Sequence, residues 1–306
     1  MANIVASFYK YAAINDPLKL RNGQLELCQS LNLKGRILIG KEGINGSVCG
    51  KRENVQKYRQ ELKKNALFSY MEFKEQEAQK QAFSRLYISV RKEIVHFGAK
   101  VDLRNTGKFL TPKELKEWLD NNEDIVLVDM RNDYESKIGK FRNAVTLNVG
   151  NFRDFPNAVK TMDWLKDKKI VAYCTGGIRC EKASAFLREK GFSNVYQLKG
   201  GILKFCEEFP DTYWEGKCFV FDERIAIDVN KKADGFADCE LCGNKAESYI
   251  NCHNLDCDRL FSCCNGCLSK WNASCSEECS KAPNRRKKNI VINQPSSSKL
   301  LSLVTT

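Results

Sequence analysis

The chain has 306 residues, of which 42% are hydrophobic and 29% charged, and its formal net charge at pH 7 is +12. This length favours two or three domains, and no apolar run approaches the roughly 20 residues of a membrane span. Residues 1–10 lack the charged start and long apolar core of a signal peptide. We therefore expect a cytoplasmic protein without a membrane partner. Its 15 cysteines should be reduced, metal-bound or catalytic rather than paired in disulfides.

The positive charge is concentrated at the N-terminal end. Residues 1–110 contain 20 Lys/Arg and 10 Asp/Glu, residues 111–235 contain 21 of each, and residues 236–306 contain 9 and 7. A basic module beside a neutral one indicates a polyanionic partner, with nucleic acid as the leading candidate. A solvated basic surface without a ligand is the alternative.

Residues 1–100 predict a domain of strands and helices. Strands are expected at 4–11, 35–39, 43–49 and 83–90, and helices at 18–31 and 53–64. This β-α-β-β-α-β order is the ferredoxin-like, acylphosphatase-like pattern, an α+β fold. Such a sheet often serves as a binding platform. The histidine of this segment, His96, is interpreted as structural.

Residues 101–218 predict an α/β domain with a parallel sheet. Thr111 and Pro112 begin a helix, with Thr111 as N-cap. The apolar run 125–129 is typical of a strand buried on both faces. Further strands are expected at 145–149, 170–173 and 195–198. Ligands bind beyond the carboxyl ends of such strands, and Cys174 lies at one of these ends.

The segment 174–182, Cys-Thr-Gly-Gly-Ile-Arg-Cys-Glu-Lys, predicts a tight loop that leads into a helix at 181–190. Loop N–H groups and the helix dipole favour an anion, so we expect a lowered pKa and a thiolate at Cys174. The active-site loop comprises Thr175, Gly176, Gly177, Ile178 and Arg179. Arg179 can bond loop carbonyls or grip an anion. The alternative is an inert buried cysteine, which does not require the Gly-Gly pair or the spaced arginine.

Three further residues could support this loop. Asp129 ends the strand at 125–129 and Arg131 follows it, and a hydrogen-bonding role without catalysis is favoured for Asp129. Cys180 could resolve an oxidised Cys174, although simple burial on the helix is favoured. The four residues between Cys174 and Arg179 make the loop too small for a phosphatase of the Cys-Arg type.

Nine of the 15 cysteines lie within residues 239–279, where apolar residues are too few for a core. Eight of them form close pairs: Cys239/Cys242, Cys252/Cys257, Cys264/Cys267 and Cys275/Cys279. This spacing predicts two tetrahedral zinc ions. Free thiols, a single partial site and an iron–sulfur cluster are alternatives. The spacing leaves open which pairs share a metal and whether Cys263 or Cys264 is a ligand. We place this Cys-rich region at 219–280 and a flexible basic, Ser-rich tail at 281–306.

These motifs resemble the rhodanese-domain tRNA uridine hydroxylases over about residues 1–280. The segments that carry the resemblance are 35–37 (Gly-Arg-Ile), 42–46 (Glu-Gly-Ile-Asn-Gly), 92–95 (Lys-Glu-Ile-Val), 128–131 (Val-Asp-x-Arg) and above all 174–182. The resemblance implies an acylphosphatase-like domain, a rhodanese domain and a Cys-rich part. It also implies oxygen-dependent conversion of the wobble uridine, position 34, of certain tRNAs to 5-hydroxyuridine. Cys174 would be the catalytic cysteine and a persulfide carrier.

No organic cofactor is evident in the sequence. Oxygen insertion normally uses iron, flavin or copper, but there is no Rossmann glycine fingerprint, and two histidines are too few for an easily assembled iron site. We therefore expect a Cys174 persulfide or thiolate to add to the pyrimidine ring or to carry electrons from an unidentified donor. The competing functions are a sulfurtransferase and a zinc-containing RNA-binding adaptor with a relict rhodanese domain. Tyr173 and Phe205 could stack on the wobble base, although core packing is favoured for both.

Overall fold

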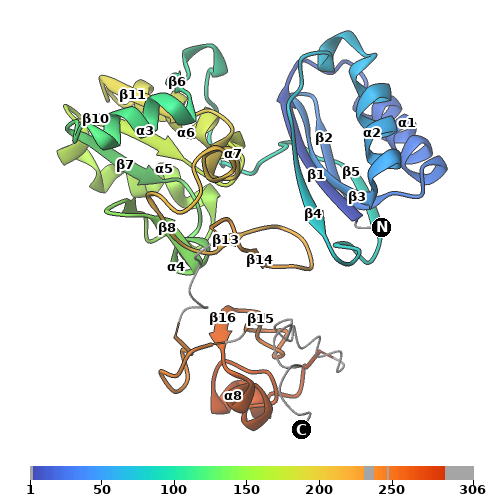
Figure 1. The fold of residues 1–306 in the computed structure, drawn as a ribbon, viewed down its shortest axis with the longest axis vertical. Coiled ribbons are helices and arrows are strands. Elements are labelled where there is room, and N and C mark those ends of the chain that lie inside the picture. The colour runs from blue at the N-terminus through green and yellow to red at the C-terminus, as the bar shows by residue number, and fades with distance from the viewer. Residues whose placement is uncertain (1–2, 231–237, 247, 287–306) are drawn as a thin grey trace, which may run out of the picture. The chain divides into compact units, whose positions relative to one another are not determined.

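The computed structural model describes residues 3–230, 238–246 and 248–286. The chain divides into two compact units, residues 1–231 and 232–306, whose elements are labelled in Figure 1. The first unit contains both predicted sheets, and the second contains the Cys-rich segment. Within the described ranges, no helix combines the length and the apolar character that crossing a membrane requires.

The N-terminal half of the first unit is a five-stranded sheet with two helices. Its elements are β1 (Asn3–Tyr11), α1 (Pro17–Ser30), β2 (Lys34–Gly40), β3 (Gly43–Lys51), α2 (Arg52–Lys63), β4 (Phe73–Ala78) and β5 (Leu86–Val90). The strand order is β4-β1-β3-β2-β5. β1, β3, β2 and β4 pair antiparallel, whereas β5 runs parallel to β2. The acylphosphatase-like fold class is confirmed.

The fourth strand of the predicted pattern is in a different place. We predict it at 83–90, but the strand that pairs with β1 is β4, and the predicted segment instead forms β5 on the opposite edge. The sequence of β4, Phe-Lys-Glu-Gln-Glu-Ala, has no apolar alternation. As an edge strand it is stabilised by its register with β1 and by the ion pair between Arg59 of α2 and Glu75.

The two faces of this sheet have different partners. α1 and α2 cover one face (Figure 1), where alternate residues of the strands, including Ile4, Ala6 and Ile37, form a buried core. The side chains in between point to the other face and are mostly polar. They include Ser7, Tyr9, Arg36, Leu38, Asn45, Ser47 and Lys74. A strand face without a covering helix is therefore available for a binding site.

The C-terminal half of the first unit contains a five-stranded sheet in the order β6-β11-β10-β7-β9, in which all pairs are parallel. Its elements are β6 (Lys108–Leu110), α3 (Pro112–Asp120), β7 (Ile125–Asp129), α4 (Asp133–Ile138), β9 (Val145–Thr146), α5 (Phe155–Ala158), β10 (Lys169–Tyr173), α6 (Ile178–Glu189), β11 (Asn194–Leu198) and α7 (Gly201–Glu208). The predicted α/β class is confirmed, and Thr111 caps α3 through a capping box with Glu114.

Helix α6 begins earlier than predicted. We predict its start at residue 181, whereas it begins at Ile178, directly after Gly177, which adopts a left-handed conformation with φ 104°. A left-handed residue turns the chain sharply and glycine adopts it without strain. Arg179 consequently belongs to the first turn of the helix and not to the loop.

Two short antiparallel strand pairs complete the first unit. β8 (Gly139–Phe141) pairs with β12 (Trp214–Gly216), and β13 (Cys218–Phe219) pairs with β14 (Ala226–Ile227). The β13–β14 hairpin begins at the predicted limit, residue 218, and still lies within the first unit. The domain limits drawn from the sequence remain predictions.

The second unit is small. It contains β15 (Ser248–Asn251), β16 (Leu260–Cys263), α8 (Asn265–Lys270) and α9 (Glu277–Lys281). Its core consists largely of cysteines around Phe261 and Leu268. Of the predicted tail at 281–306, only the residues up to 286 are described. Arg285 donates hydrogen bonds to the carbonyls of Cys279 and Asn272, and residues 287–306 lie outside the described residues.

Candidate functional site

Cys174 is the first residue after β10, at the carboxyl end of the central strand of the parallel sheet. Its side chain is 1% exposed. The N–H of Gly177 donates to its Sγ at 3.1 Å, and the N–H of Arg179 and the thiol of Cys180 are close enough to the sulfur to lower its pKa. Donor groups from the loop and from the first turn of α6 therefore surround one sulfur.

These donors stabilise the thiolate against the cost of burial. Burial alone would raise the pKa of Cys174, but the Cys180 hydrogen bond, the charge of Arg179 and the two backbone N–H groups together lower that pKa to about 5. Cys180 has the opposite behaviour, because burial raises its pKa well above the ordinary thiol value. At neutral pH, Cys174 is the thiolate and Cys180 remains the proton donor.

Glu135 is the partner of Arg179, and sequence reasoning did not assign it a role. Its carboxylate accepts from Arg179 Nη1 at 2.5 Å and from Nη2 at 2.8 Å. Both side chains are buried. The Arg179 guanidinium thus makes a bidentate ion pair with Glu135 inside the protein. Its Nη2 also lies 3.5 Å from Thr175 Oγ1. The sequence signal was available, since Glu135 stands in the Asp-x-Arg-x3-Glu motif after β7.

Asp129 and Arg131 form the layer beneath this pair. Arg131 donates to both carboxylate oxygens of Asp129, and neither side chain is exposed to solvent. Arg131 also bonds the carbonyls of Glu135 and Gly139. Asp129 and Arg131 thus position α4, which carries Glu135, and they do not line the cavity described below.

Helix α7 holds the loop from behind. The N–H groups of Ile202 and Leu203 donate to the carbonyls of Cys174 and Thr175 at 3.0 and 3.2 Å. A Cβ on Gly201 would lie 2.4 Å from the Cys174 carbonyl oxygen, and its φ is +68°. Only glycine permits this approach. The Gly-Gly pair after the strand at 195–198 was the signal in the sequence for this contact.

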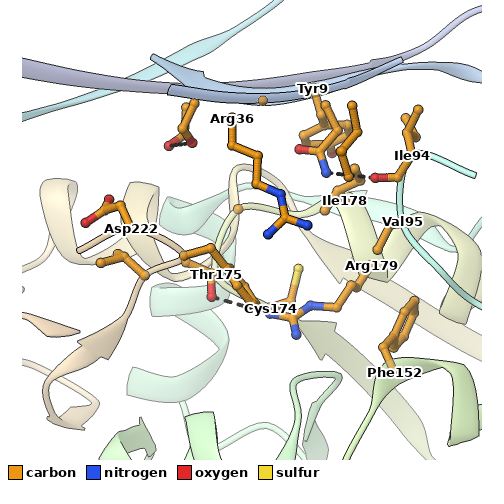
Figure 2. Close-up of a pocket in the computed structure, with 18 of the residues that line it drawn as sticks. Tyr9, Arg36, Ile94, Val95, Phe152, Cys174, Thr175, Ile178, Arg179 and Asp222 are labelled. Atoms are coloured by element: carbon orange, nitrogen blue, oxygen red, sulfur yellow. Dashed lines mark hydrogen bonds between the residues drawn. The ribbon is translucent and has the colours of Figure 1, made fainter. Parts of the chain in front are cut away.

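Cys174 lines a cavity of about 490 Å³ between the loop and the open face of the N-terminal sheet. One wall carries Cys174, Thr175 and Ile178, and the opposite wall carries Arg36 and Lys74 with the other residues of that sheet face. Figure 2 shows the Cys174 sulfur and the Arg36 guanidinium pointing toward each other across this space. The N-terminal sheet therefore completes the site that the Cys174 loop begins.

The cavity wall is basic and partly aromatic. Four Lys or Arg side chains line it (Arg36, Lys74, Arg153 and Arg179), whereas its one acidic residue, Asp222, is ion-paired with Arg224. Phe221 of the β13–β14 hairpin also lines it and is 56% exposed. The aromatic side chains that the sequence singled out, Tyr173 and Phe205, are both 0% exposed, in agreement with the favoured core packing.

A buried lysine joins the two halves of the first unit. Lys182 of α6 has a side chain that is only 3% exposed, and its Nζ donates to Glu42, Glu93 and the carbonyl of Val95 at 3.0–3.2 Å. Glu42 precedes β3 and Glu93 lies in the segment between the two sheets. Three of the sequence segments that carry the family resemblance therefore meet at this one ammonium group.

The N-terminal sheet also contacts the loop directly. Tyr11 Oη donates to the carbonyl of Ile178 at 3.3 Å, and a Cβ on Gly177 would lie 2.9 Å from Tyr9 Oη. The side chain of Lys74 passes over Gly176. Glycine at 177 thus allows both the loop geometry and the close approach of the sheet.

The cysteines of the second unit gather into two groups of four: Cys239, Cys242, Cys264 and Cys267, and Cys252, Cys257, Cys275 and Cys279. Within each group the ligand atoms lie within 4.8 Å of one another. The first pair therefore joins the third and the second joins the fourth, which answers the question that spacing left open. Cys264 is the member of the group, whereas Cys263 is fully buried in the core.

The geometry of both groups fits a tetrahedral metal ion. A Zn–S distance of about 2.3 Å corresponds to sulfur atoms about 3.8 Å apart. The Sγ–Sγ distances are 3.6 Å for Cys242–Cys264, 3.7 Å for Cys257–Cys275 and 3.9 Å for Cys275–Cys279. Both groups are therefore able to hold a metal ion.

Three family models match the chain. They are described as a UPF0176 acylphosphatase-like domain over residues 3–94, a rhodanese-like domain over residues 111–208 and a rhodanase C-terminal region over residues 215–280. The fold and the cysteine loop thus define a rhodanese-type protein with an acylphosphatase-like domain before the loop and a Cys-rich region after it.

Relatives match nearly the whole chain. A protein from Cytophaga hutchinsonii named tRNA uridine(34) hydroxylase is 45% identical over 282 residues, or 91% of this chain and 90% of that protein. Proteins of the same name from Aster yellows witches'-broom phytoplasma and Staphylococcus haemolyticus are each 42% identical to this chain. Both alignments cover 92% of this chain, and they cover 94% and 90% of the two relatives, respectively. The chain belongs to the tRNA uridine(34) hydroxylase family.

Proposed function

We propose that this protein hydroxylates ring carbon 5 of the wobble uridine of tRNA, with Cys174 as the catalytic cysteine and molecular oxygen as co-substrate. The observation that carries the proposal is the cavity, in which a thiolate at the end of β10 faces a basic sheet. Its volume of about 490 Å³ is within the usual range for small-molecule sites, roughly 300–1,000 Å³. The names of the relatives supply the reaction, and we place it in the cytoplasm.

The reaction replaces a C–H bond by a C–OH bond. One atom of molecular oxygen enters the ring and the other leaves as water, so two electrons and two protons are consumed. A separate reductant, a protein or a small molecule, supplies these electrons. Cys174 takes part as a thiolate or persulfide, either by adding to the ring or by carrying the electrons. Arg179, Gly177 and Cys180 keep its sulfur anionic while the substrate enters.

The target base has to leave its stack to reach Cys174. The wobble base is unpaired in its loop, and proteins that bind such bases stack them on aromatic rings. Phe221 is the aromatic side chain we propose for this role, because it is exposed at the cavity and its ring lies 5.6 Å from the Arg179 guanidinium carbon. It replaces the two buried aromatics, Tyr173 and Phe205, that the sequence brought forward.

Zinc is the metal we propose for both four-cysteine groups. All-thiolate tetrahedral sites without an open position are typical of structural zinc, and the binding energy of the metal stabilises a unit that has a very small apolar core. Elemental analysis of the purified protein is expected to find two equivalents of zinc per chain. One equivalent, or iron in place of zinc, would contradict this assignment.

Nucleoside mass spectrometry of tRNA tests the reaction. Cells that lack the protein are complemented with the wild type or with Cys174→Ser, and 5-hydroxyuridine derivatives are quantified. We expect them to be lost without the protein and restored by the wild type alone. Unchanged hydroxyuridine with altered thiolated nucleosides would instead identify a sulfurtransferase. No change in either would favour the RNA-binding adaptor.

A further inference from the structure

Two cations on the N-terminal sheet form no ion pair with any carboxylate of the described residues. Arg36 of β2 and Lys74 of β4 both line the cavity on the wall that faces Cys174. Across the described ranges, Arg36 makes no ion pair or hydrogen bond with its side chain, and Lys74 Nζ has the Tyr9 ring, 5.3 Å away, in place of a carboxylate. A guanidinium and an ammonium group are thus presented to the cavity with their donors free.

Two other charged residues of the cavity wall are compensated within the protein. Arg179 is held by Glu135, and Asp222 is held by Arg224. The positive charge of Arg36 and Lys74 is consequently not balanced by neighbouring carboxylates of the cavity wall. Cationic groups gathered in a partly enclosed space attract an anion, and the attraction is stronger there than on an open surface.

We propose that Arg36 and Lys74 form a phosphate subsite that holds a backbone phosphate of the substrate RNA beside the target nucleotide, so that its base faces Cys174. This inference rests on the proposed function and names the groups that position the substrate. A guanidinium binds phosphate oxygens through two parallel N–H groups, whereas an ammonium group acts as a point charge. The two cations therefore differ in role. Arg36 orients the phosphate and Lys74 adds attraction.

The position of Lys74 supports the assignment. Its side chain passes over Gly176, so its ammonium group is placed between the sheet and the catalytic loop. Burial lowers the pKa of Lys74 and outweighs the opposing influence of Glu72 and Cys174. A cation that is desolvated without a bonded carboxylate gains most when an anion enters beside it.

The size of the cavity decides which anion is expected. Phosphate on a nucleotide and thiosulfate, a small sulfur donor, share the same anionic oxygen chemistry. A cavity of about 490 Å³ with aromatic side chains on its wall suits a nucleotide, with the base against the aromatic ring and the phosphate on the cations. A small inorganic anion would leave most of that space unused.

Protection of Cys174 from alkylation tests the subsite without measuring hydroxylation. The full-length protein is treated with iodoacetamide in the presence of uridine monophosphate, uridine, inorganic phosphate or thiosulfate, and modification of the Cys174 peptide is followed by mass spectrometry. For the wild type we expect uridine monophosphate to protect at a concentration roughly 10- to 100-fold lower than uridine, as expected for hydrogen bonds to a charged group. Equal protection by the two ligands would overturn the proposal.

Variants assign this difference to the two residues. In Arg36→Gln and in Lys74→Gln, uridine monophosphate and uridine are expected to protect Cys174 at similar concentrations. Arg36→Lys should retain part of the difference seen in the wild type. Arg52→Gln is the matched control, because Arg52 lies on α2, pairs with Glu77 and does not line the cavity. A difference that persists in Arg36→Gln would overturn the proposal. So would protection by thiosulfate or phosphate but not by the nucleotide.

Kinetics separate this inference from the proposed function. If the wild type hydroxylates tRNA, Arg36→Gln should raise KM for tRNA roughly 10-fold or more, with a much smaller change in kcat. If the wild type hydroxylates tRNA and Arg36→Gln leaves KM unaltered, the phosphate subsite is refuted and the proposed function stands. Selective protection by uridine monophosphate in a protein that does not hydroxylate tRNA would refute the proposed function and leave the subsite standing.

Discussion

Cys174 and the cysteines of the second unit differ in what stabilises their charge. Around Cys174 the protein itself supplies the compensation, through the N–H groups of Gly177 and Arg179, the guanidinium of Arg179 and the thiol of Cys180. In the second unit, four sulfur atoms lie within 4.8 Å of one another in each group. Four thiolates so close together would repel one another, and a divalent cation relieves that repulsion.

The difference explains two uses of one residue type. A single thiolate held by hydrogen-bond donors remains a nucleophile, because none of its donors takes up its reactive lone pair permanently. A thiolate shared with a structural metal is unreactive but contributes directly to folding free energy. We therefore expect changes at Cys174 to affect chemistry with little effect on stability, and changes in the clusters to have the opposite effect.

The largest effect is expected for Cys264→Ser. It removes one ligand from the group with Cys239, Cys242 and Cys267, and structural zinc contributes on the order of 10 kcal/mol to the folding of small metal-bound units. Metal content should fall from two equivalents to one and the second unit should become sensitive to protease. Cys263→Ser is the control next to it and should retain both ions. Equal metal loss in the two variants would contradict the grouping.

The second prediction concerns Cys174→Ser. Loss of the nucleophile should lower hydroxylation at least about 1,000-fold, in the range found for removal of a catalytic nucleophile, while metal content and melting temperature stay close to those of the wild type. The assay is single-turnover hydroxylation of a tRNA substrate with calorimetry alongside. Retained hydroxylation would remove Cys174 from the chemistry.

The third prediction concerns the buried pair beneath the loop. Glu135→Gln leaves the Arg179 guanidinium without its counter-charge, and breaking one side of a buried pair costs about 3 kcal/mol or more. Chemical denaturation of the first unit should show this loss. Glu123→Gln is the control, since Glu123 forms a half-exposed pair with Lys169 and such pairs contribute roughly 0–1 kcal/mol. A similar loss of unfolding free energy in both variants would show that the buried Glu135–Arg179 pair contributes no more to stability than the half-exposed pair.

The smallest predicted effect is a shift in the pH dependence of Cys174. Its pKa of about 5 means that the thiol form dominates below pH 5 and the reactive thiolate above it, so alkylation should be half-maximal near pH 5. Cys180→Ala removes one hydrogen bond to the thiolate and should raise that midpoint by about one unit. At pH 8 the two rates should coincide, and an unmoved midpoint would show that Cys180 does not stabilise the thiolate.

The reactive loop was predictable because its chemistry is local. Cys174, the Gly-Gly pair and Arg179 lie within six consecutive residues, and a strand that ends there is enough to direct loop N–H groups at the sulfur. The sequence also indicated both fold classes, through the apolar run at 125–129 and the strand–helix alternation of residues 1–100. The role of Glu135 was not predicted, because it depends on a side chain 44 residues from its partner.

The sequence alone therefore singled out the residues that we propose for the chemistry: a lone cysteine at the start of a loop, and eight cysteines spaced as metal ligands. Only the tertiary structure decided what they face. The sheet order β4-β1-β3-β2-β5 places Arg36 and Lys74 on one face, and the contacts of Lys182 bring that face to the loop. Hydrogen bonding within a turn depends on neighbouring residues, whereas strand order, cysteine grouping and the wall of a cavity depend on contacts between distant ones.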